Sequence, residues 1–319
     1  MNFKYYVKCR WWNWLVGLPF GDRLYLAGKK LLGQYPIAFN VSDIRFHCAE
    51  RFRDTYIAYI SKPIQDASVF EFGSGYELFI TMCMASFGFK NIHAVDRINW
   101  TLPSSLNFAA EHVKKRTDYP SILSSPPRFN RKNYKQTLLD YYHIDFHAPS
   151  DARKTLLSEN SIDYIYTNDV LEHIPQEDIK SILIECQRIL LPGGIIAFAI
   201  DYKDHCRDEI ISPYYFLQFS LAEWNKIYPP GGHNRMRHID YKYLFEDAGF
   251  EILEEKAISP FTPDILDPYH DPPLQSSTKL IEILKSMPIA KEFSNYPIEE
   301  LAKLTGYWIL RKPYTQNKL

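Results

Sequence analysis

The sequence lacks any run of about 18 or more uncharged apolar residues, so nothing in it predicts a membrane-spanning helix. Its five cysteines are odd in number and never form a C-x-x-C pair, so neither a disulfide framework nor a zinc knuckle is indicated. Scattered thiols of this kind are typical of reducing compartments, and we expect a cytoplasmic protein. With a net charge of −1, the chain has no general attraction to nucleic acid, and we expect no such partner.

What is present is ordinary for a soluble globular protein, with 46% hydrophobic and 24% charged residues. The 319 residues can form one large domain, or a medium domain with extensions. Aromatic residues are abundant at 15%, which suits either an aromatic core or a site that stacks on rings. The composition leaves the oligomeric state undetermined.

The first thirty residues combine cations with aromatic side chains. Six of them are Lys or Arg, only Asp22 is acidic, and tryptophans stand at positions 11, 12 and 14. No uninterrupted apolar segment with a cleavage site follows, so a cleaved signal peptide is not expected. One alternative is peripheral contact of residues 1–30 with the inner face of a membrane, because such segments bind anionic headgroups. The other is an arm that packs over the following domain or forms a dimer contact.

Strand and helix patterns alternate from Ser68 onward, as they do in α/β domains. Strands are predicted at 69–72, 91–96, 142–146, 162–167, 194–200, 250–256 and 306–311. Helices are predicted from Ser42 or Asp43 to about 60, and at 77–87, 104–115, 176–190, 240–248 and 278–284. We therefore predict a Rossmann-like, seven-stranded mixed sheet with helices on both faces. Residues 1–67 form an arm and a helix in this interpretation, and residues 68–319 form the α/β domain.

Two stretches interrupt the alternating pattern. One is polar and Pro-rich at 119–135, and the other is a long insertion at 259–304, before the last predicted strand. Loops of that length inside a compact domain are usually functional. We expect both stretches to cover a binding site as lids.

The strongest motif is Val69-Phe-Glu-Phe-Gly-Ser-Gly-Tyr-Glu77, at the end of the first predicted strand. Gly73 and Gly75 allow a tight turn and a close approach of a ligand to the main chain. The helix that follows offers free N–H groups to a carboxylate. Asp96 ends the next predicted strand, where a carboxylate can accept hydrogen bonds from two ribose hydroxyls.

These residues resemble the class I S-adenosylmethionine (SAM)-dependent methyltransferase family, together with Asp145, Asn168-Asp-Val-Leu-Glu-His173 and Leu191-Pro-Gly-Gly194. The resemblance covers roughly residues 68–253, and it implies that SAM is the cofactor. It assigns the methionine end of SAM to Glu71, Gly73 and Gly75, the ribose to Asp96, and the adenine to Asp145 and Phe146. It places Asn168 in the pocket near the sulfonium, with His173 close by.

Glu77 stands where the family often has a third glycine. Its charge would repel the methionine carboxylate, so we expect the side chain to point away from the cofactor. A nicotinamide-dinucleotide site would need a glycine at position 78, which is Leu78. A dehydrogenase is therefore not indicated.

The acceptor of the methyl group is expected at the carboxyl ends of the fourth and fifth strands. The methyl group of SAM is already activated, so transfer to a hydroxyl needs alignment and a base. Asp201, Asp204, His205 and Arg207 follow the fifth predicted strand. His205 is the first candidate for the base, because imidazole titrates nearest neutral pH, and Asp201 orients it or acts instead. His173 completes the candidate catalytic set.

The strings Ile200-Asp-Tyr-Lys-Asp-His205 and Asn234-Arg-Met-Arg237 are similar to those of methyltransferases associated with bacterial surface-polysaccharide biosynthesis. This resemblance implies a sugar or glycolipid hydroxyl as acceptor. Arg235 and Arg237 either clamp a phosphate or carboxylate of the acceptor, or are only surface charges or helix-start packing. Two other functions stay open, namely a non-catalytic protein of this fold that binds a partner or lipid, and an RNA or protein methyltransferase.

A divalent ion is a further alternative at the acceptor side. The side chains that could gather one are Asp201, Asp204, His205, His233 and His238. Their spacing is not diagnostic in the way that H-E-x-x-H is, so we predict no metal site.

Overall fold

The computed structural model describes residues 39–99, 101–116, 126–207, 210–227, 233–261 and 276–314. Before residue 39 it describes only 5–7, 9, 10, 18, 21, 24, 27, 28 and 31. The predicted membrane contact of residues 1–30 therefore lies largely outside the described residues. The two predicted lids lie outside them in part, at 119–125 and 262–275.

Seven strands of the described residues form one mixed sheet, as predicted, in the order β3-β2-β1-β4-β5-β7-β6. They are β1 (Ser68–Phe72), β2 (Asn91–Val95), β3 (Ile144–His147), β4 (Ile162–Asn168), β5 (Leu190–Asp201), β6 (Glu251–Ile258) and β7 (Thr305–Arg311). β1 to β5 pair in parallel, whereas β7 pairs antiparallel with both β5 and β6. The strand order reverses between β1 and β4, and ligands of such sheets bind at the carboxyl ends beside that point.

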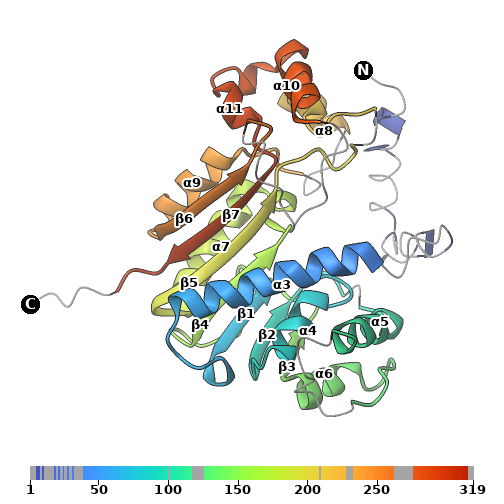
Figure 1. The fold of residues 1–319 in the computed structure, drawn as a ribbon, viewed down its shortest axis with the longest axis vertical. Coiled ribbons are helices and arrows are strands. Elements are labelled where there is room, and N and C mark those ends of the chain that lie inside the picture. Colours follow the sequence, from blue (N-terminus) through green and yellow to red (C-terminus); the bar gives the residue numbers. More distant parts are fainter. Residues whose placement is uncertain are drawn as a thin grey trace, which may run out of the picture.

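Helices cover both faces of the sheet (Figure 1). One face carries α3 (Phe39–Tyr59), α4 (Phe79–Ser86), α5 (Pro103–Lys114) and α6 (Tyr134–Tyr142), and the other carries α7 (Gln176–Ile189) and α9 (His238–Asp247). Each face of the sheet has its own apolar core, and we call the one under α3 to α6 the main core. Side chains alternate along the central strands, so Tyr164 and Tyr166 of β4 belong to the main core, while Ile165 belongs to the core on the opposite face. β1, most of β4 and the second half of β5 are buried on both faces, and these central strands are correspondingly rich in apolar residues.

α3 contributes to the main core of the domain. Phe46 and Phe52 of this helix are buried, and the Tyr164 hydroxyl donates to the carbonyl oxygen of Phe52 at 3.0 Å. The helix begins at Phe39, before the start predicted at Ser42 or Asp43. The predicted division of the chain at residue 67 stays a prediction.

Three local predictions differ from the structure. The helix predicted at 77–87 begins at Phe79, because Leu78 adopts a left-handed conformation with φ of 51°. β5 begins at Leu190 instead of at 194, because Leu190 pairs with Ile162 ahead of an irregularity in the β4–β5 pairing. α6 was not predicted. Because this helix ends at Tyr142, the third strand begins at Ile144 instead of at 142 and ends at His147.

A helical cover lies beyond the carboxyl end of β5 (Figure 1). It consists of η3 (Tyr215–Gln218), α8 (Leu221–Ile227), α10 (Ser277–Ser286), η4 (Lys291–Phe293) and α11 (Ile298–Leu301), whose apolar side chains share a third cluster. The described part of the insertion is thus packed structure, and the helix predicted at 278–284 is present as α10.

Two residues of the N-terminal arm belong to the same cover. Tyr5 and Cys9 are buried in its apolar cluster, and the Tyr5 hydroxyl donates to an Asp204 carboxylate oxygen at 2.7 Å. These two residues pack as the arm alternative predicts. No helix in the described ranges has the length and apolarity that crossing a membrane requires.

Candidate active site

The loop between β1 and α4 allows a ligand to approach the main chain closely. Gly73 and Gly75 both have φ of +71°, a conformation that residues with side chains rarely adopt. A Cβ added at Gly73 would lie 2.5 Å from Val170 Cγ2, whereas no atom of the described residues lies within 4 Å of a Cβ added at Gly75. Gly73 therefore lets two loops pack together, and Gly75 leaves open space beside the backbone.

Asp96 lies beside this loop, directly after β2. Its carboxylate accepts hydrogen bonds from the backbone N–H groups of Gly75 and Ile98, both at 3.0 Å. Each oxygen keeps a further lone pair for a ligand. Burial raises the pKa of Asp96, and the two N–H donors oppose that rise. The structure thus brings the predicted ribose-binding carboxylate against the predicted methionine-binding loop.

Asp145 and Phe146 lie on β3, at the edge of the sheet. Asp145 is the second residue of the strand and not its last, because β3 continues to His147. Its carboxylate pairs with His147 Nε2 at 2.8 Å and lies 3.6 Å from His93 Nδ1. Phe146 points to the other face, where its ring is buried in the main core. Contact of both residues with the adenine stays a prediction.

Two buried polar atoms near the glycine loop have no hydrogen-bond partner within the described part of the chain, namely Ser74 Oγ and Asn168 Oδ1. Asn168 ends β4, and its Nδ2 donates to Asp169 Oδ2 at 2.7 Å. A ligand with hydroxyl or amino groups would satisfy such acceptors. The open space at Gly75, the lone pairs of Asp96 and the acceptor on Asn168 together fit the amino-acid and ribose parts of SAM.

The two glutamates of the glycine motif are both buried and both have partners. Glu71 accepts a hydrogen bond from Thr81 Oγ1 at 2.5 Å, and burial raises its pKa to about 7. Its predicted role at the methionine end of SAM stays a prediction, because the carboxylate faces α4. Glu77 pairs with Arg45 of α3 at 2.8 Å. The arginine compensates the charge that would otherwise repel the methionine carboxylate.

Asp201 and His205 lie together at the end of β5, as predicted. Asp201 Oδ2 lies 3.7 Å from His205 Nε2 and 3.8 Å from Arg207 Nη1, and its Oδ1 lies 3.0 Å from Lys203 Nζ. Two cations thus stabilise the charged form of Asp201, which favours an orienting role over a basic one. Burial lowers the pKa of His205 to about 4, although Asp201 opposes that effect. The imidazole is therefore neutral near pH 7 and can accept a proton.

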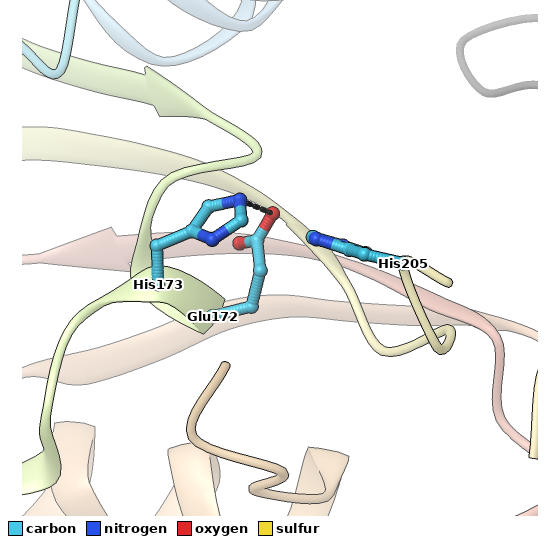
Figure 2. Close-up of side chains that lie close together, drawn as sticks. All are labelled: Glu172, His173 and His205. Carbon is cyan, nitrogen blue, oxygen red and sulfur yellow. Dashed lines mark ion pairs between the residues drawn. The ribbon is translucent and has the colours of Figure 1, made fainter. Parts of the chain in front are cut away.

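Three imidazoles form a row at this edge of the sheet. The ring of His205 lies 4.7 Å from that of His173 in η2 (Leu171–His173) and 4.9 Å from that of His233, measured between centroids. Figure 2 shows the Glu172 carboxylate between His173 and His205, with Oε1 3.9 Å from His173 Nε2. Glu172 is 1% exposed, and neither of its oxygens has a hydrogen-bond partner among the described residues.

Asn234 holds the loop that carries this glutamate. Its Nδ2 donates to the carbonyl oxygens of Leu171 and Ile174 at 2.8 and 2.9 Å. Its backbone N–H donates to the carbonyl oxygen of Glu172 at 2.8 Å. Asn234 is thus a positioning residue for Glu172 and His173.

Arg235 and Arg237 are buried and bonded to the backbone. Arg237 donates to the carbonyl oxygens of Tyr202 and Leu301 at 3.0 and 3.1 Å, and Arg235 donates to that of Phe219 at 2.6 Å. Of the two alternatives for these arginines, packing is therefore correct.

Asp204 and His238 also have structural partners. Asp204 accepts hydrogen bonds from Tyr5 and from the backbone N–H of Cys206, both at 2.7 Å. His238 is hydrogen-bonded to Tyr202 at 3.0 Å and to Glu255 at 2.9 Å. These contacts set both residues apart from the row of imidazoles.

The sequence model of a family described as "Methyltransferase domain" matches residues 45–255, more than half of the 319-residue chain. The chain belongs to this methyltransferase family. The match runs from α3 into β6 and includes every predicted cofactor-binding and catalytic residue. The protein is accordingly a methyltransferase of the class I fold, and SAM is its cofactor.

Solved structures with a similar fold are distant in sequence from this methyltransferase. A methyltransferase solved with the Trm112 activator of Haloferax volcanii has 15% identity and a TM-score of 0.46, over 88% of this chain and 97% of that one. Phosphoethanolamine N-methyltransferase 2 of Haemonchus contortus, in complex with SAM, has 13% identity and a TM-score of 0.47, over 89% and 60%. A Galdieria sulphuraria protein assigned as a sarcosine dimethylglycine methyltransferase has 17% identity and a TM-score of 0.43, over 84% and 86%. No curated protein sequence matches this one.

The methyltransferase site includes residues that sequence reasoning did not single out. Glu172 lies inside a motif that was recognised. The sequence does not show, however, that its carboxylate is buried without a hydrogen-bond partner among the described residues. Lys203 and Arg45 compensate Asp201 and Glu77, and Arg45 comes from a helix outside every motif. Nothing in the sequence pairs Arg45 with Glu77, because the two residues lie on different elements.

Proposed function

We propose that this methyltransferase methylates a hydroxyl oxygen of a sugar or glycolipid, with His205 accepting the hydroxyl proton. The observation that carries the proposal is the partly buried, neutral imidazole of His205, 3.7 Å from Asp201 at the carboxyl end of β5. A hydroxyl must lose its proton as the oxygen takes up the methyl group, so a neutral imidazole is the group that this reaction needs. A neutral amine attacks with its lone pair and needs no base before transfer.

The remaining catalytic residues assist His205 in this proposal. Asp201 orients the imidazole, and Lys203 and Arg207 keep the Asp201 carboxylate ionised. His173 faces His205 and is 44% exposed at its side chain, so it is accessible to an acceptor. The acceptor hydroxyl would lie between the two rings and the cofactor side of the sheet.

We assign SAM to the same edge, next to the glycine loop. Glu71, Gly73 and Gly75 would hold its methionine end, and Asn168 would line the pocket near the sulfonium. Asp96 would bind its ribose, and Asp145 with Phe146 its adenine. When bound, SAM supplies a methyl group activated by the sulfonium. Support comes from the open space at Gly75 and from the two Asp96 oxygens, whose N–H donors leave lone pairs for the ribose hydroxyls.

The sugar or glycolipid class rests on the similarity of the strings at 200–205 and 234–237 to polysaccharide-associated methyltransferases. In the structure the second string supports the site through Asn234, which fixes the loop of Glu172 and His173. Peripheral contact of residues 1–30 with a membrane belongs to the same proposal, because it would bring the enzyme to a glycolipid.

The test uses SAM labelled in its methyl group and a panel of methyl glycosides, glycolipids and amines. We expect label in an ether that is stable to base, with SAM binding measured separately by calorimetry. His205→Gln should lower kcat by about 10²- to 10⁴-fold, because it removes the base, and should leave the affinity for SAM unchanged.

The matched control is His143→Asn. His143 is exposed and has φ of 57°, a conformation that Asn tolerates, so this variant removes an imidazole without disturbing the site. Label found on nitrogen alone, or full turnover by His205→Gln, would refute the proposal.

A further inference from the structure

The cluster of Glu172, His173 and His205 has the composition of a metal site. We propose that these three side chains bind a divalent transition-metal ion at the acceptor side of the sheet. The proposal departs from the expectation of no metal site that the sequence spacing suggested. That expectation considered residues between Asp201 and His238 and did not include Glu172 or His173, which follow a different strand.

The geometry brings one ligand atom from each residue into a small volume. The three atoms, one carboxylate oxygen and two imidazole nitrogens, all lie within 4.8 Å of one another. Ligand atoms at about 2.0–2.2 Å from one ion lie roughly 3.0–3.5 Å apart from one another. Side-chain rotations that move these atoms by about an ångström would therefore bring all three within bonding distance of one ion. His173 and His205 flank the carboxylate from opposite sides (Figure 2). Three protein ligands leave further positions open for an oxygen of the acceptor.

Glu172 is the group that most needs such an ion. A buried carboxylate without hydrogen bonds is costly, and both of its oxygens are without a hydrogen-bond partner among the described residues. The nearby ammonium of Lys203 lies at Asp201, 3.0 Å from its Oδ1. A bound cation would compensate the Glu172 charge.

His233 supplies an independent observation. Its Nδ1 accepts a hydrogen bond from the backbone N–H of Arg235 at 3.1 Å, so the neutral ring carries its proton on Nε2. That Nε2 is buried, and it has no partner within the ranges that the structure describes. The ring lies next to His205, where Nε2–H could donate to an oxygen bound at the ion. A second buried polar group thus lacks a partner at the same place.

The donor set indicates the kind of ion. Two imidazoles and one carboxylate suit Mn²⁺, Fe²⁺, Co²⁺ or Zn²⁺, whereas Mg²⁺ prefers oxygen ligands alone. An ion at this position would bind an oxygen of the acceptor and lower the pKa of its hydroxyl. In the ion-loaded protein His205 is a ligand and cannot accept a proton, so the turnover assay that tests His205 as the base is run on the metal-free protein, with a chelator present. Ion binding itself does not require the proposed acceptor.

The experiment measures ion binding by the full-length protein without an acceptor. The protein is stripped with a chelator, dialysed and titrated with Co²⁺, whose visible absorption reports nitrogen and oxygen ligands. We expect one ion per chain, displaced by Zn²⁺ because Zn²⁺ stands higher in the affinity order, but not by excess Mg²⁺. His173→Ala and Glu172→Gln should each weaken Co²⁺ binding by about tenfold or more.

His143→Asn serves as the matched control and should bind Co²⁺ like the wild type. His173 is 44% exposed at its side chain, so His173→Ala tests the site even where the buried Glu172→Gln variant does not fold. No Co²⁺ or Zn²⁺ binding by the folded wild type, or equal binding by His173→Ala, would overturn the proposal. In that event a loss of turnover in His205→Gln would still support His205 as the base, so the two proposals fail separately.

Discussion

Asp96 and Glu172 are carboxylates at the same edge of one sheet, yet their surroundings differ. Asp96 accepts two backbone hydrogen bonds, beside a loop in which Gly73 and Gly75 expose the main chain. Glu172 lies among side chains, with His173 and His205 on either side and no hydrogen-bond partner for its oxygens among the described residues. The proposed cofactor side is therefore organised by backbone groups around Asp96, and the proposed acceptor side by side chains.

The site around Asp96 and the site around Glu172 obtain their specificity in different ways. A backbone site depends on φ angles and close packing, so it is organised before the ligand arrives. A site of buried side chains depends on charge and protonation, so it is completed by a ligand, an ion or a proton. Substitutions of the two glycines should thus act through backbone strain and packing, whereas those of Asp96 and of the acceptor side should act through charge and hydrogen bonding.

The largest effect is expected from Gly73→Ala. The added Cβ would lie 2.5 Å from Val170 Cγ2, at a φ of +71°. A left-handed backbone costs a residue with a side chain roughly 1–2 kcal/mol, and overpacking costs about 1–3 kcal/mol more. Urea denaturation should therefore show that the free energy of unfolding falls by the sum of the two costs. SAM affinity should fall with it, as measured by calorimetry.

Gly75→Ala is the matched comparison, because it has the same φ but open space around the Cβ. It should carry only the strain of roughly 1–2 kcal/mol. Equal stability losses in the two variants would mean that the contact with Val170 is not a packing constraint. Gly73→Ala combined with Val170→Ala should recover part of the loss.

A smaller effect is expected from Asp96→Ala on the affinity for SAM. Loss of hydrogen bonds to an ionised carboxylate should weaken binding by about 1.5–3 kcal/mol in calorimetry. Asp151→Asn removes an exposed carboxylate paired with Arg153 and serves as the control. Unchanged affinity in a folded Asp96→Ala protein would remove Asp96 from the cofactor site.

The smallest effect is a pH dependence of stability that belongs to the acceptor side. The folded-state pKa of His205 is lowered to about 4 by burial, against an ordinary value of 6.5. Above pH 6.5 the group is neutral in both states. As the pH falls from 6.5 towards 4, only the unfolded chain takes up the proton, so the free energy of unfolding decreases. The slope is at most about 1.4 kcal/mol per pH unit.

His205→Asn should remove this contribution. Urea denaturation of both proteins at pH 7.5 and pH 5, with a chelator present, measures the difference between them. His233 and His238 also have lowered pKa values through burial, and they stay in both proteins. An identical pH response in wild type and variant would show that His205 titrates normally in the folded state.

Much of the architecture could be predicted from the sequence. The seven strands, the helices that flank them and the neighbourhood of Asp96 and the glycine loop follow from local apolar runs and from glycine positions. Element boundaries were less accurate, because pairing and single backbone conformations set them. Leu78 in the left-handed region delays α4, and the continuation of β3 to His147 leaves Asp145 inside the strand.

The acceptor side was predicted only in part. Asp201 and His205 are close because they are four residues apart after one strand. The partners that give the site its character come from elsewhere, namely Glu172 from the loop after β4 and His233 from the segment before α9. Arg235 and Arg237 looked equally suited to an acceptor clamp, and only their burial against carbonyl oxygens assigns them to packing.

Local residue patterns were enough to predict the sheet, the glycine loop and the position of Asp96 beside it, because each depends on short-range patterns of apolar residues, glycines and strand ends. Tertiary structure alone decided which charges are compensated. Glu77 has Arg45 and Asp201 has Lys203, whereas Glu172 is buried between imidazoles without a hydrogen-bond partner in the described residues. The physical reason is that protonation and ion binding depend on burial and on neighbours in space, and local residue patterns do not specify either.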